Sequence, residues 1–390
     1  MIPYTSFLYF GVALYVLIPA LIAGLFKRIW KIWLVIATIV MLIIQYFSTQ
    51  NILPNFPVNE ILLVIAYAVF QWLLAILFLF TGKRGKSQPI FYIAVFLSLL
   101  PLLGAKFIPL FQANYQIFFL GLSYVSFRSL DVIIGIHDEM IQSVPPIQYF
   151  TYLLLFTTIS SGPIDRFRRF NEDWKRERTR DEFLLDLDGG IHRIFTGFLY
   201  KFILAALIKQ YWLDPVSQGT NVLHIVSYMY AYTFYLFFDF AGYSAFAIGF
   251  SYIFGIRTPE NFNRPFLSRD IREFWNRWHM SLSFWFRDHI YNRFVFSALK
   301  NKWFKNRYAA SYIGYIITMG LMGVWHGIAL NYIVYGLYHG VLMALTDWLD
   351  HHHKRSRLLN DKGFGWQAAS VLITFHLVAF SFLIFSGRLF

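Results

Sequence analysis

The chain has 390 residues, of which 57% are hydrophobic and only 14% are charged, and its formal net charge is +13. Soluble globular proteins carry about 25% charged residues, so the composition excludes an ordinary soluble fold. The basic residues form short clusters between apolar runs and accompany no RNA- or DNA-binding motif, which argues against a nucleic-acid partner, and the absence of cysteine excludes disulfides, zinc thiolate sites and a cysteine nucleophile.

The apolar residues form long runs, most of them close to the ~20 residues that a helix needs to cross a bilayer core. They predict an all-α polytopic membrane protein with about 11 transmembrane helices, at residues 5–26, 32–48, 59–81, 90–104, 114–135, 147–161, 191–212, 222–254, 309–328, 331–349 and 366–386. The run at 147–161 is short enough to be re-entrant. The run at 222–254 is too long for one upright helix, so it should tilt strongly or break at Gly242 or Gly249.

Basic residues mark alternate connections between these spans, and such connections face the cytoplasm. They hold Lys27, Arg28 and Lys31, then Lys83, Arg84 and Lys86, and finally Lys354, Arg355 and Arg357. The connections at 51–59 and 214–221 contain no basic residue and should lie outside. This alternation predicts a multi-pass protein of the cell membrane with both termini extracellular.

The segment 256–308 interrupts the pattern because it contains no run that could span. Between Asp270 and Asp288 apolar residues recur at helical spacing, with Arg272, Arg277 and Arg287 between them. This spacing predicts one amphipathic helix in an interfacial or partly re-entrant position. A half-buried cytoplasmic element of this size is expected to build a site.

Two histidines are the main candidates for chemistry, because ionisable residues within apolar sequence are costly and are often functional. His326 lies between two apolar stretches, and its neighbours Gly323 and Gly327 permit close approach of another backbone. A packing role with a hydrogen bond to a carbonyl explains His326 equally well. His279 lies at the border of the amphipathic face, where a histidine that reaches the membrane interface is at least as good an interpretation.

Two other polar features have structural interpretations. Asp239 stands alone in an apolar run, which is costly unless the carboxylate is paired, so an Arg or Tyr partner is expected. The run His351–His353, with two nearby aspartates, resembles a metal cluster. It lies in a basic cytoplasmic loop, however, and is interpreted as solvated, so no metal site is expected.

The residues that the chain lacks narrow the chemistry. Without cysteine and without a Gly-x-Ser-x-Gly elbow, a hydrolase with a covalent triad is poorly supported. A neutral histidine in a low-dielectric tunnel could instead deprotonate a hydroxyl that attacks a thioester. A transporter, in which the histidines relay protons or pack helices, is an alternative. It should show broken spans in matching halves, whereas the polar residues here concentrate in the second half.

Four ordered motifs resemble those of the membrane-bound O-acyltransferase (MBOAT) superfamily. They are FDFAGYS at 238–244, ENFNRPF at 260–266, EFWNRWHMSLSFW at 273–285 and GVWHG at 323–327, with SGPI at 161–164 upstream, so that the match covers residues 160–345 approximately. The start Met1–Tyr4, the compact length and Tyr338–Gly340 most resemble the branch that D-alanylates teichoic acid in Gram-positive bacteria.

The alginate-type polysaccharide O-acetyltransferases share most of these motifs. They usually continue after the position of Asp288 into a Tyr-x-x-x-Gly-Gly-like turn, where this chain has HIYNRFVF at 289–296. That departure favours the D-alanyl branch and leaves the acetyltransferase as the alternative.

The resemblance implies an MBOAT fold in a single domain over residues 1–390, in which a ring of transmembrane helices surrounds a thin central partition, with amphipathic or re-entrant helices in addition. It places the essential histidine, the general base, at His326 and the second motif histidine at His279. The donor would be D-alanine held as a thioester on the phosphopantetheine of a small acidic carrier protein, so this chain would bind no cofactor and no metal of its own. A net charge of +13 agrees with an acidic partner.

The resemblance also implies a route for the acyl group. The exposed apolar residues Phe294, Val295 and Phe296 would dock the carrier, and the alternative for them is simple contact with the membrane interface. The D-alanyl group would leave on the outer side toward lipoteichoic acid, either directly or through a small membrane peptide.

Overall fold

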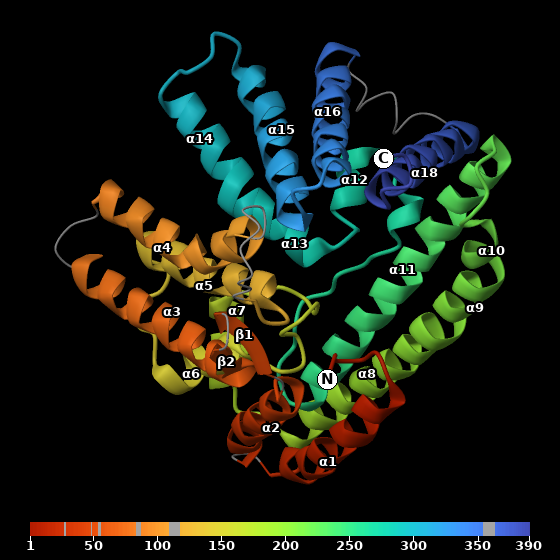
Figure 1. The fold of residues 1–390 in the computed structure, drawn as a ribbon. Coiled ribbons are helices and arrows are strands. Elements are labelled where there is room, and N and C mark those ends of the chain that lie inside the picture. Colours follow the sequence, from red (N-terminus) through yellow and green to blue (C-terminus); the bar gives the residue numbers. More distant parts are fainter. Residues whose placement is uncertain (27–28, 48, 54–55, 83–86, 109–117, 354–362) are drawn as a thin grey trace. The chain divides into compact units, whose positions relative to one another are not determined.

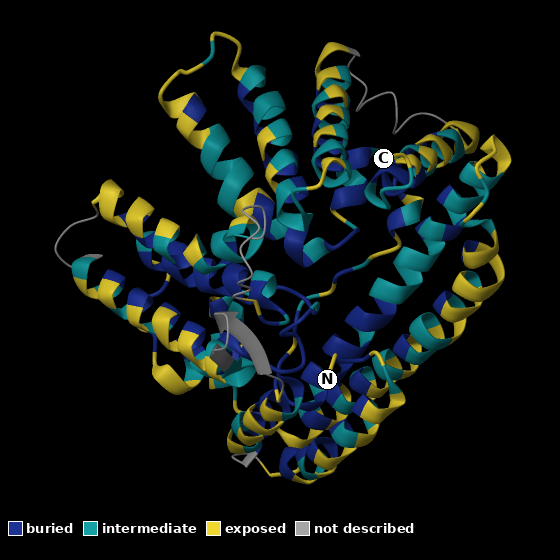
Figure 2. Cartoon of the chain, in the orientation of Figure 1, coloured by how far each residue is buried: buried dark blue, intermediate teal, exposed yellow. Residues whose placement is uncertain are grey.

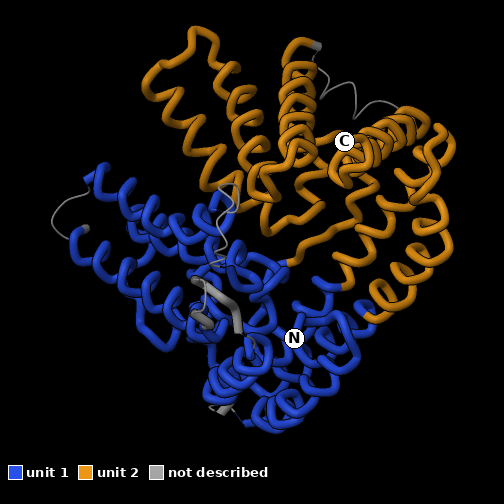
Figure 3. The backbone as a smooth tube through the Cα atoms, in the orientation of Figure 1, with its two compact units in different colours: residues 1–197, 243–259 blue, residues 198–242, 260–390 orange. Residues whose placement is uncertain are grey.

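The computed structural model describes residues 1–26, 29–47, 49–53, 56–82, 87–108, 118–353 and 363–390. The chain forms two compact units (Figure 3), unit 1 with residues 1–197 and 243–259 and unit 2 with residues 198–242 and 260–390. Helices dominate both units, as predicted (Figure 1). One short antiparallel hairpin, β1 (Thr49–Leu53) and β2 (Phe56–Asn59), departs from the all-α expectation. The single domain over 1–390 stays a prediction.

Six helices of the described residues are long and apolar enough to cross a membrane. They cover Phe7–Gly24, Glu60–Thr81, Gln88–Phe107, Arg180–Val216, Val222–Ile253 and Phe364–Phe385, and a shorter apolar helix covers Trp30–Gln45. All seven coincide with predicted runs. The predicted total near eleven is not confirmed, because the remaining runs are shorter or carry more polar residues.

Unit 1 is built around one buried helix. Its helices are α1 (Phe7–Gly24), α2 (Ile29–Gln45), α3 (Glu60–Gly82), α4 (Gln88–Phe107), α5 (Leu122–His137), α6 (Pro146–Leu153), α7 (Phe167–Lys175) and α8 (Arg180–Gly197), with the end of α11 (Val222–Ile253). Every residue of α5 from Val125 to Ile136 is buried (Figure 2). The helices α3 and α4 expose many large apolar side chains, as segments that face lipid do.

The expected span at 147–161 is wrong, and the buried Arg128 of α5 explains why. Helix α6 ends at Leu153 after only 8 residues. The guanidinium of Arg128 donates hydrogen bonds to the carbonyls of Tyr152 and Leu153 at 3.2 Å and of Thr158 at 2.9 Å. A buried charge must be satisfied, and carbonyls in the last turn of a helix or beyond it have no partner within the helix and can accept from it. The apolar composition of 147–161 could not reveal this partner, which lies more than twenty residues upstream.

The most charged segment of the chain, residues 165–182, is largely neutralised within unit 1. Arg178, whose side chain is buried, lies 3.2 Å from the carboxylate of Asp186 and donates to the carbonyls of Tyr252 and Ile253. Arg257 donates to the same aspartate at 2.7 Å. These arginines therefore hold the end of α11 to α8, and they contribute less to an open basic surface than their number suggests.

Unit 2 contains the candidate site. Its elements are η2 (Phe198–Ala205), α9 (Ala206–Ile208), η3 (Lys209–Leu213), α10 (Asp214–Val216), the first part of α11, η4 (Pro265–Leu267), α12 (Ile271–Trp275), α13 (Met280–Phe286), η5 (Arg287–Tyr291), α14 (Asn292–Lys300), α15 (Arg307–His326), α16 (Leu330–His353) and α18 (Phe364–Phe385). Helix α11 runs without a break through Gly242 and Gly249. A Cβ on Gly249 would lie 2.7 Å from the carbonyl of Gly190, so this glycine permits close packing of α8 rather than a break.

The partner of Asp239 is Lys201 of η2, not the arginine or tyrosine that was expected. The sequence places Lys201 in an apolar run of its own, where a lone lysine is as costly as a lone aspartate. Pairing the two removes both costs. The sequence pattern identifies Lys201 and Asp239 as isolated charges in apolar runs. It does not reveal their contact, because the contact depends on how η2 packs on α11.

Candidate active site

The segment 270–288 is not one amphipathic helix, so that prediction is wrong. Helix α12 begins after Asp270, whose carboxylate accepts hydrogen bonds from the backbone N–H groups of Arg272 and Glu273 at 2.8 and 2.9 Å. It ends at Trp275, and α13 begins only at Met280. The four residues between them turn the chain and carry the first candidate histidine.

This break is held by the motif at 260–266. The N–H of Asn263 donates to the carbonyl of Arg277 at 2.9 Å, and the N–H of Met280 donates to the carbonyl of Asn261 at 2.9 Å. The buried side chain of Asn261 also accepts a hydrogen bond from the hydroxyl of Ser281 at 2.6 Å. Two motifs that are separate in sequence, 260–266 and 273–285, are thus joined by hydrogen bonds into one turn. Helical spacing alone does not reveal these hydrogen bonds.

His279 lies in this turn and has a left-handed backbone conformation, at φ 44° and ψ 49°. A side chain other than glycine adopts this conformation at some cost, so the surrounding hydrogen bonds must hold it. The imidazole is buried, and its ring packs edge-on against Phe240 of α11 with the ring centres 4.7 Å apart. Burial lowers the pKa of His279 to about 3, and the nearby charge that His326 can carry lowers it as well. His279 is therefore neutral at physiological pH.

His326 is the last residue of α15, and the helix pair α15–α16 places it. A Cβ on Gly323 would lie 2.4 Å from the carbonyl of Tyr332, and a Cβ on Gly336 would lie 2.4 Å from the carbonyl of Met319. Only glycines allow this approach of the two backbones. The role predicted for Gly323 is confirmed by this packing.

The ring of His326 lies in an aromatic cluster at the end of the pair. Its centre is 5.0 Å from that of Phe385 in α18 and 6.2 Å from that of Tyr335 in α16. His326 is half-buried, whereas His279 is fully enclosed. Both predicted histidines thus lie in unit 2, His279 against Phe240 of α11 and His326 against Phe385 of α18.

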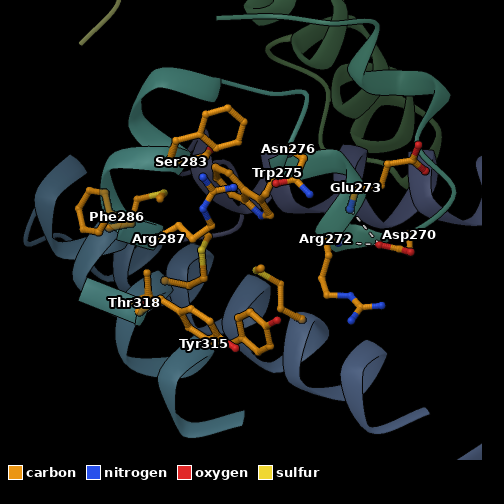
Figure 4. A pocket seen from close by; sticks show the side chains of 15 residues that line it. Asp270, Arg272, Glu273, Trp275, Asn276, Ser283, Phe286, Arg287, Tyr315 and Thr318 are labelled. Carbon is orange, nitrogen blue, oxygen red and sulfur yellow. Dashed lines mark hydrogen bonds between the residues drawn. The ribbon is translucent and has the colours of Figure 1, made fainter. Parts of the chain in front are cut away.

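Unit 2 contains a pocket of about 450 Å³ (Figure 4). Its wall includes Trp275, four residues before His279 at the end of α12, and Met322, one helical turn before His326 in α15. Eight of the 15 lining residues are aromatic or methionine, and charges of both signs line the pocket as well, from Arg272 and Arg287 and from Asp270 and Glu273. Arg272 is held by Asp347 at 3.0 Å and by Asp350. The pocket suits a ligand that is partly apolar and carries several polar groups.

Sequence reasoning missed His339 as a site residue. It lies on α16, its side chain is fully buried, and its Nδ1 accepts a hydrogen bond from the indole Nε1 of Trp275 at 3.2 Å. His339 has the same sequence feature that singled out His326, because it is an ionisable residue in an apolar run. The sequence pattern gave no sign that α16 brings it against the wall of the pocket.

The three apolar residues expected to dock a carrier do not share one environment. Phe296 is 70% exposed. Phe294 is half-buried and packs its ring on Trp303, while half-buried Val295 packs against Gly314 of α15. The expectation that all three are exposed is wrong for Phe294 and Val295, because α14 turns that side toward α15.

Comparison with known proteins places the chain in context. It matches the model of the MBOAT, membrane-bound O-acyltransferase family over residues 22–386. It is 42% identical to the teichoic acid D-alanyltransferase of Bacillus subtilis, over 100% of this chain and 98% of that protein, and 40% identical to that of Streptococcus thermophilus, over 98% of this chain and 94% of that protein. It is 34% identical to the probable alginate O-acetylase AlgI of Pseudomonas aeruginosa, over 69% of this chain and 49% of that protein.

Proposed function

Because the chain belongs to the membrane-bound O-acyltransferase family and is therefore an acyltransferase, we propose that it transfers D-alanine from a carrier-protein thioester toward teichoic acid. The observation that carries the proposal is that both predicted histidines follow residues of one pocket, His279 after Trp275 and Asn276 and His326 after Met322, in a chain that resembles teichoic acid D-alanyltransferases over its whole length. The resemblance to alginate O-acetylases is weaker and covers less of the chain.

In the proposed reaction His326 is the general base. It removes the proton from an acceptor hydroxyl as the oxygen attacks the thioester carbonyl, so that the C–O bond forms. The C–S bond then breaks, and the imidazolium of His326 returns the proton to the departing thiolate sulfur. The products are an ester and a free thiol, and no covalent enzyme intermediate is needed. A positioned general base contributes a factor of about 10²–10⁴ to such a rate.

His279 has a different role in this proposal. It is buried and neutral, so it is a poor proton donor near pH 7, and it would instead position the thioester through the turn that follows the pocket residues Trp275 and Asn276. The pocket volume of about 450 Å³ lies within the range of about 300–1,000 Å³ for small-molecule sites. Its walls combine aromatic and methionine side chains with polar and charged groups, which fits the methylene and amide units of a phosphopantetheine arm. The carrier protein would supply that arm, as part of the substrate.

The carrier would dock on α14 and the turn that follows it. Phe296, Leu299 and Trp303 are 70%, 46% and 54% exposed. Exposed basic residues surround them, namely Lys300, Lys302, Lys305 and Arg307. An apolar patch ringed by positive charge is complementary to an acidic carrier, and such complementarity raises the association rate.

Replacing Phe296 by aspartate is expected to weaken carrier binding at least about tenfold, because a buried contact is lost and a negative charge meets an acidic partner. Binding of the carrier to the detergent-purified protein measures the effect. Phe296→Tyr is the matched control and should bind within about threefold of wild type, since it keeps the ring. Equal binding by wild type and Phe296→Asp would remove this surface from the proposal.

Both termini are proposed to lie outside the cell and the acyl group to leave on that side. This orientation is supported by the connection 214–221, which has no basic residue, and by the exposed basic turn after α14. Of the basic residues used to predict it, Lys27, Arg28, Lys83, Arg84, Lys86, Lys354, Arg355 and Arg357 lie outside the described residues. Lipoteichoic acid as final acceptor, and a small membrane peptide as intermediate acceptor, belong to the same proposal.

The function is tested with one carrier protein prepared in three forms: D-alanyl-charged, acetyl-charged and uncharged. Each form is incubated with the purified chain in lipid nanodiscs, and bound carrier and acyl transfer are measured. Preference for the D-alanyl form is expected. Preference for the acetyl form would overturn the D-alanyl assignment in favour of a polysaccharide O-acetyltransferase. Binding of none of the three would overturn the carrier as donor.

A further inference from the structure

We propose that His339 is a positioning residue, which fixes the indole of Trp275 as the wall of the thioester pocket and so sets how the acyl donor lies against His326; this role rests on the proposed function. The inference begins with one contact. The indole Nε1 of Trp275 lies 3.2 Å from Nδ1 of His339, and both side chains are buried.

The contact defines the state of the histidine. An indole N–H can only donate, so Nδ1 of His339 must accept. An accepting Nδ1 carries no proton, which makes the ring neutral with its single proton on Nε2. Within the part of the chain that the structure describes, Nε2 has no hydrogen-bond partner. Burying the Nε2–H donor without a partner costs free energy. The hydrogen bond that Nδ1 accepts from Trp275 explains why a histidine occupies this position despite that cost.

The position of His339 links the two parts of the site. Trp275 lines the pocket of about 450 Å³. On the other side, Tyr335 of α16 packs its ring 4.8 Å from the ring centre of His339 and 6.2 Å from that of His326. A change at His339 therefore reaches the pocket wall directly and the candidate base through one buried ring.

Packing alone does not require a histidine here. The ring of His339 is parallel to that of Phe274, with centres 6.2 Å apart, and meets Trp275 edge-on at 5.1 Å. A phenylalanine would fill much of the same volume in this aromatic surrounding without bringing an unpaired polar atom. What histidine adds is an acceptor at Nδ1, and the orientation of a bicyclic indole depends on it.

The variants separate the acceptor from the ring. His339→Phe keeps a ring without an acceptor, and Trp275→Phe removes the donor. His339→Asn places an amide oxygen close to the position of Nδ1 and should restore the contact. Trp212→Phe is the matched control, because its indole donates to Ser227 at 2.9 Å on the exposed side of η3, away from the pocket residues.

The first measurement is the kinetics of acyl transfer, with whichever charged carrier the wild-type protein uses. His339→Phe and Trp275→Phe should each lower kcat/KM about tenfold, and the double variant should also lose about tenfold, because both changes remove one contact. His339→Asn should stay within about threefold of wild type. A loss of about a hundredfold in the double variant, or an equal loss in His339→Asn and His339→Phe, would overturn the proposal.

The second measurement does not depend on activity. Ultraviolet resonance Raman difference spectra, wild type minus Trp275→Phe, report the hydrogen bond of this one indole N–H. The bonded signature should persist in His339→Asn and vanish in His339→Phe, and its persistence in both would overturn the contact. If wild type transfers neither D-alanine nor acetate, the proposed function fails while the Raman comparison still decides the contact.

Discussion

Replacing His326 by alanine is expected to lower acyl transfer by about 10²–10⁴-fold, the range that a positioned general base contributes. The loss should appear in kcat rather than in the binding of the charged carrier, because His326 is not among the residues that line the pocket. Steady-state transfer with charged carrier in nanodiscs measures both parameters.

The control for this variant is His192→Ala, which removes another histidine whose side chain is 74% exposed on α8. Both proteins should insert and elute as wild type does, since His326 is half-buried at the end of its helix and leaves the glycine contact of α15 with α16 untouched. Wild-type transfer by His326→Ala would refute the assignment of the base. A failure of His192→Ala as well would point to general damage.

Replacing Gly336 by alanine is expected to separate α15 from α16 and to lose both stability and transfer. The added methyl carbon would lie 2.4 Å from the carbonyl of Met319 and 3.0 Å from the Cα of Gly323, and both are backbone atoms that cannot rotate away. Overpacking of this kind costs about 1–3 kcal/mol or more. Thermal unfolding of the purified protein and its transfer rate should both fall.

The matched control is Gly320→Ala in α15. Its methyl carbon would meet only the side chain of Leu337, at the ordinary distance of 3.5 Å. Alanine also favours a helix over glycine by roughly 1 kcal/mol, so this variant should be as stable as wild type or slightly more so. If Gly336→Ala proved as stable and active as Gly320→Ala, the glycine contact would not be what places His326.

Composition and periodicity predicted the features that a local pattern encodes. A long apolar run forms a helix wherever the chain places it, because lipid offers no partner for backbone groups. The coincidence of all seven apolar helices with predicted runs follows from this. His326 and His279 stood out for a related reason, since polar residues in apolar sequence are rarely kept without use.

The failures share a physical cause, which is that each depends on a partner distant in sequence. The run at 147–161 looks apolar enough to span, but its helix ends at Leu153, and Arg128 donates to carbonyls at that end and beyond it. The spacing after Asp270 suits one helix, but the pairing with Asn261 breaks it at His279. The exposure expected of Val295 was lost to its contact with Gly314 of α15.

The sequence by itself therefore determined that this is a helical membrane protein and singled out His279 and His326, because hydrophobicity and the cost of buried charge act residue by residue. Only the tertiary structure decided which groups meet. Lys201 neutralises Asp239, and His339 holds Trp275 at the pocket. Contacts of this kind form between helices that are brought together only when the chain packs, and no pattern within one helix specifies the partner on another.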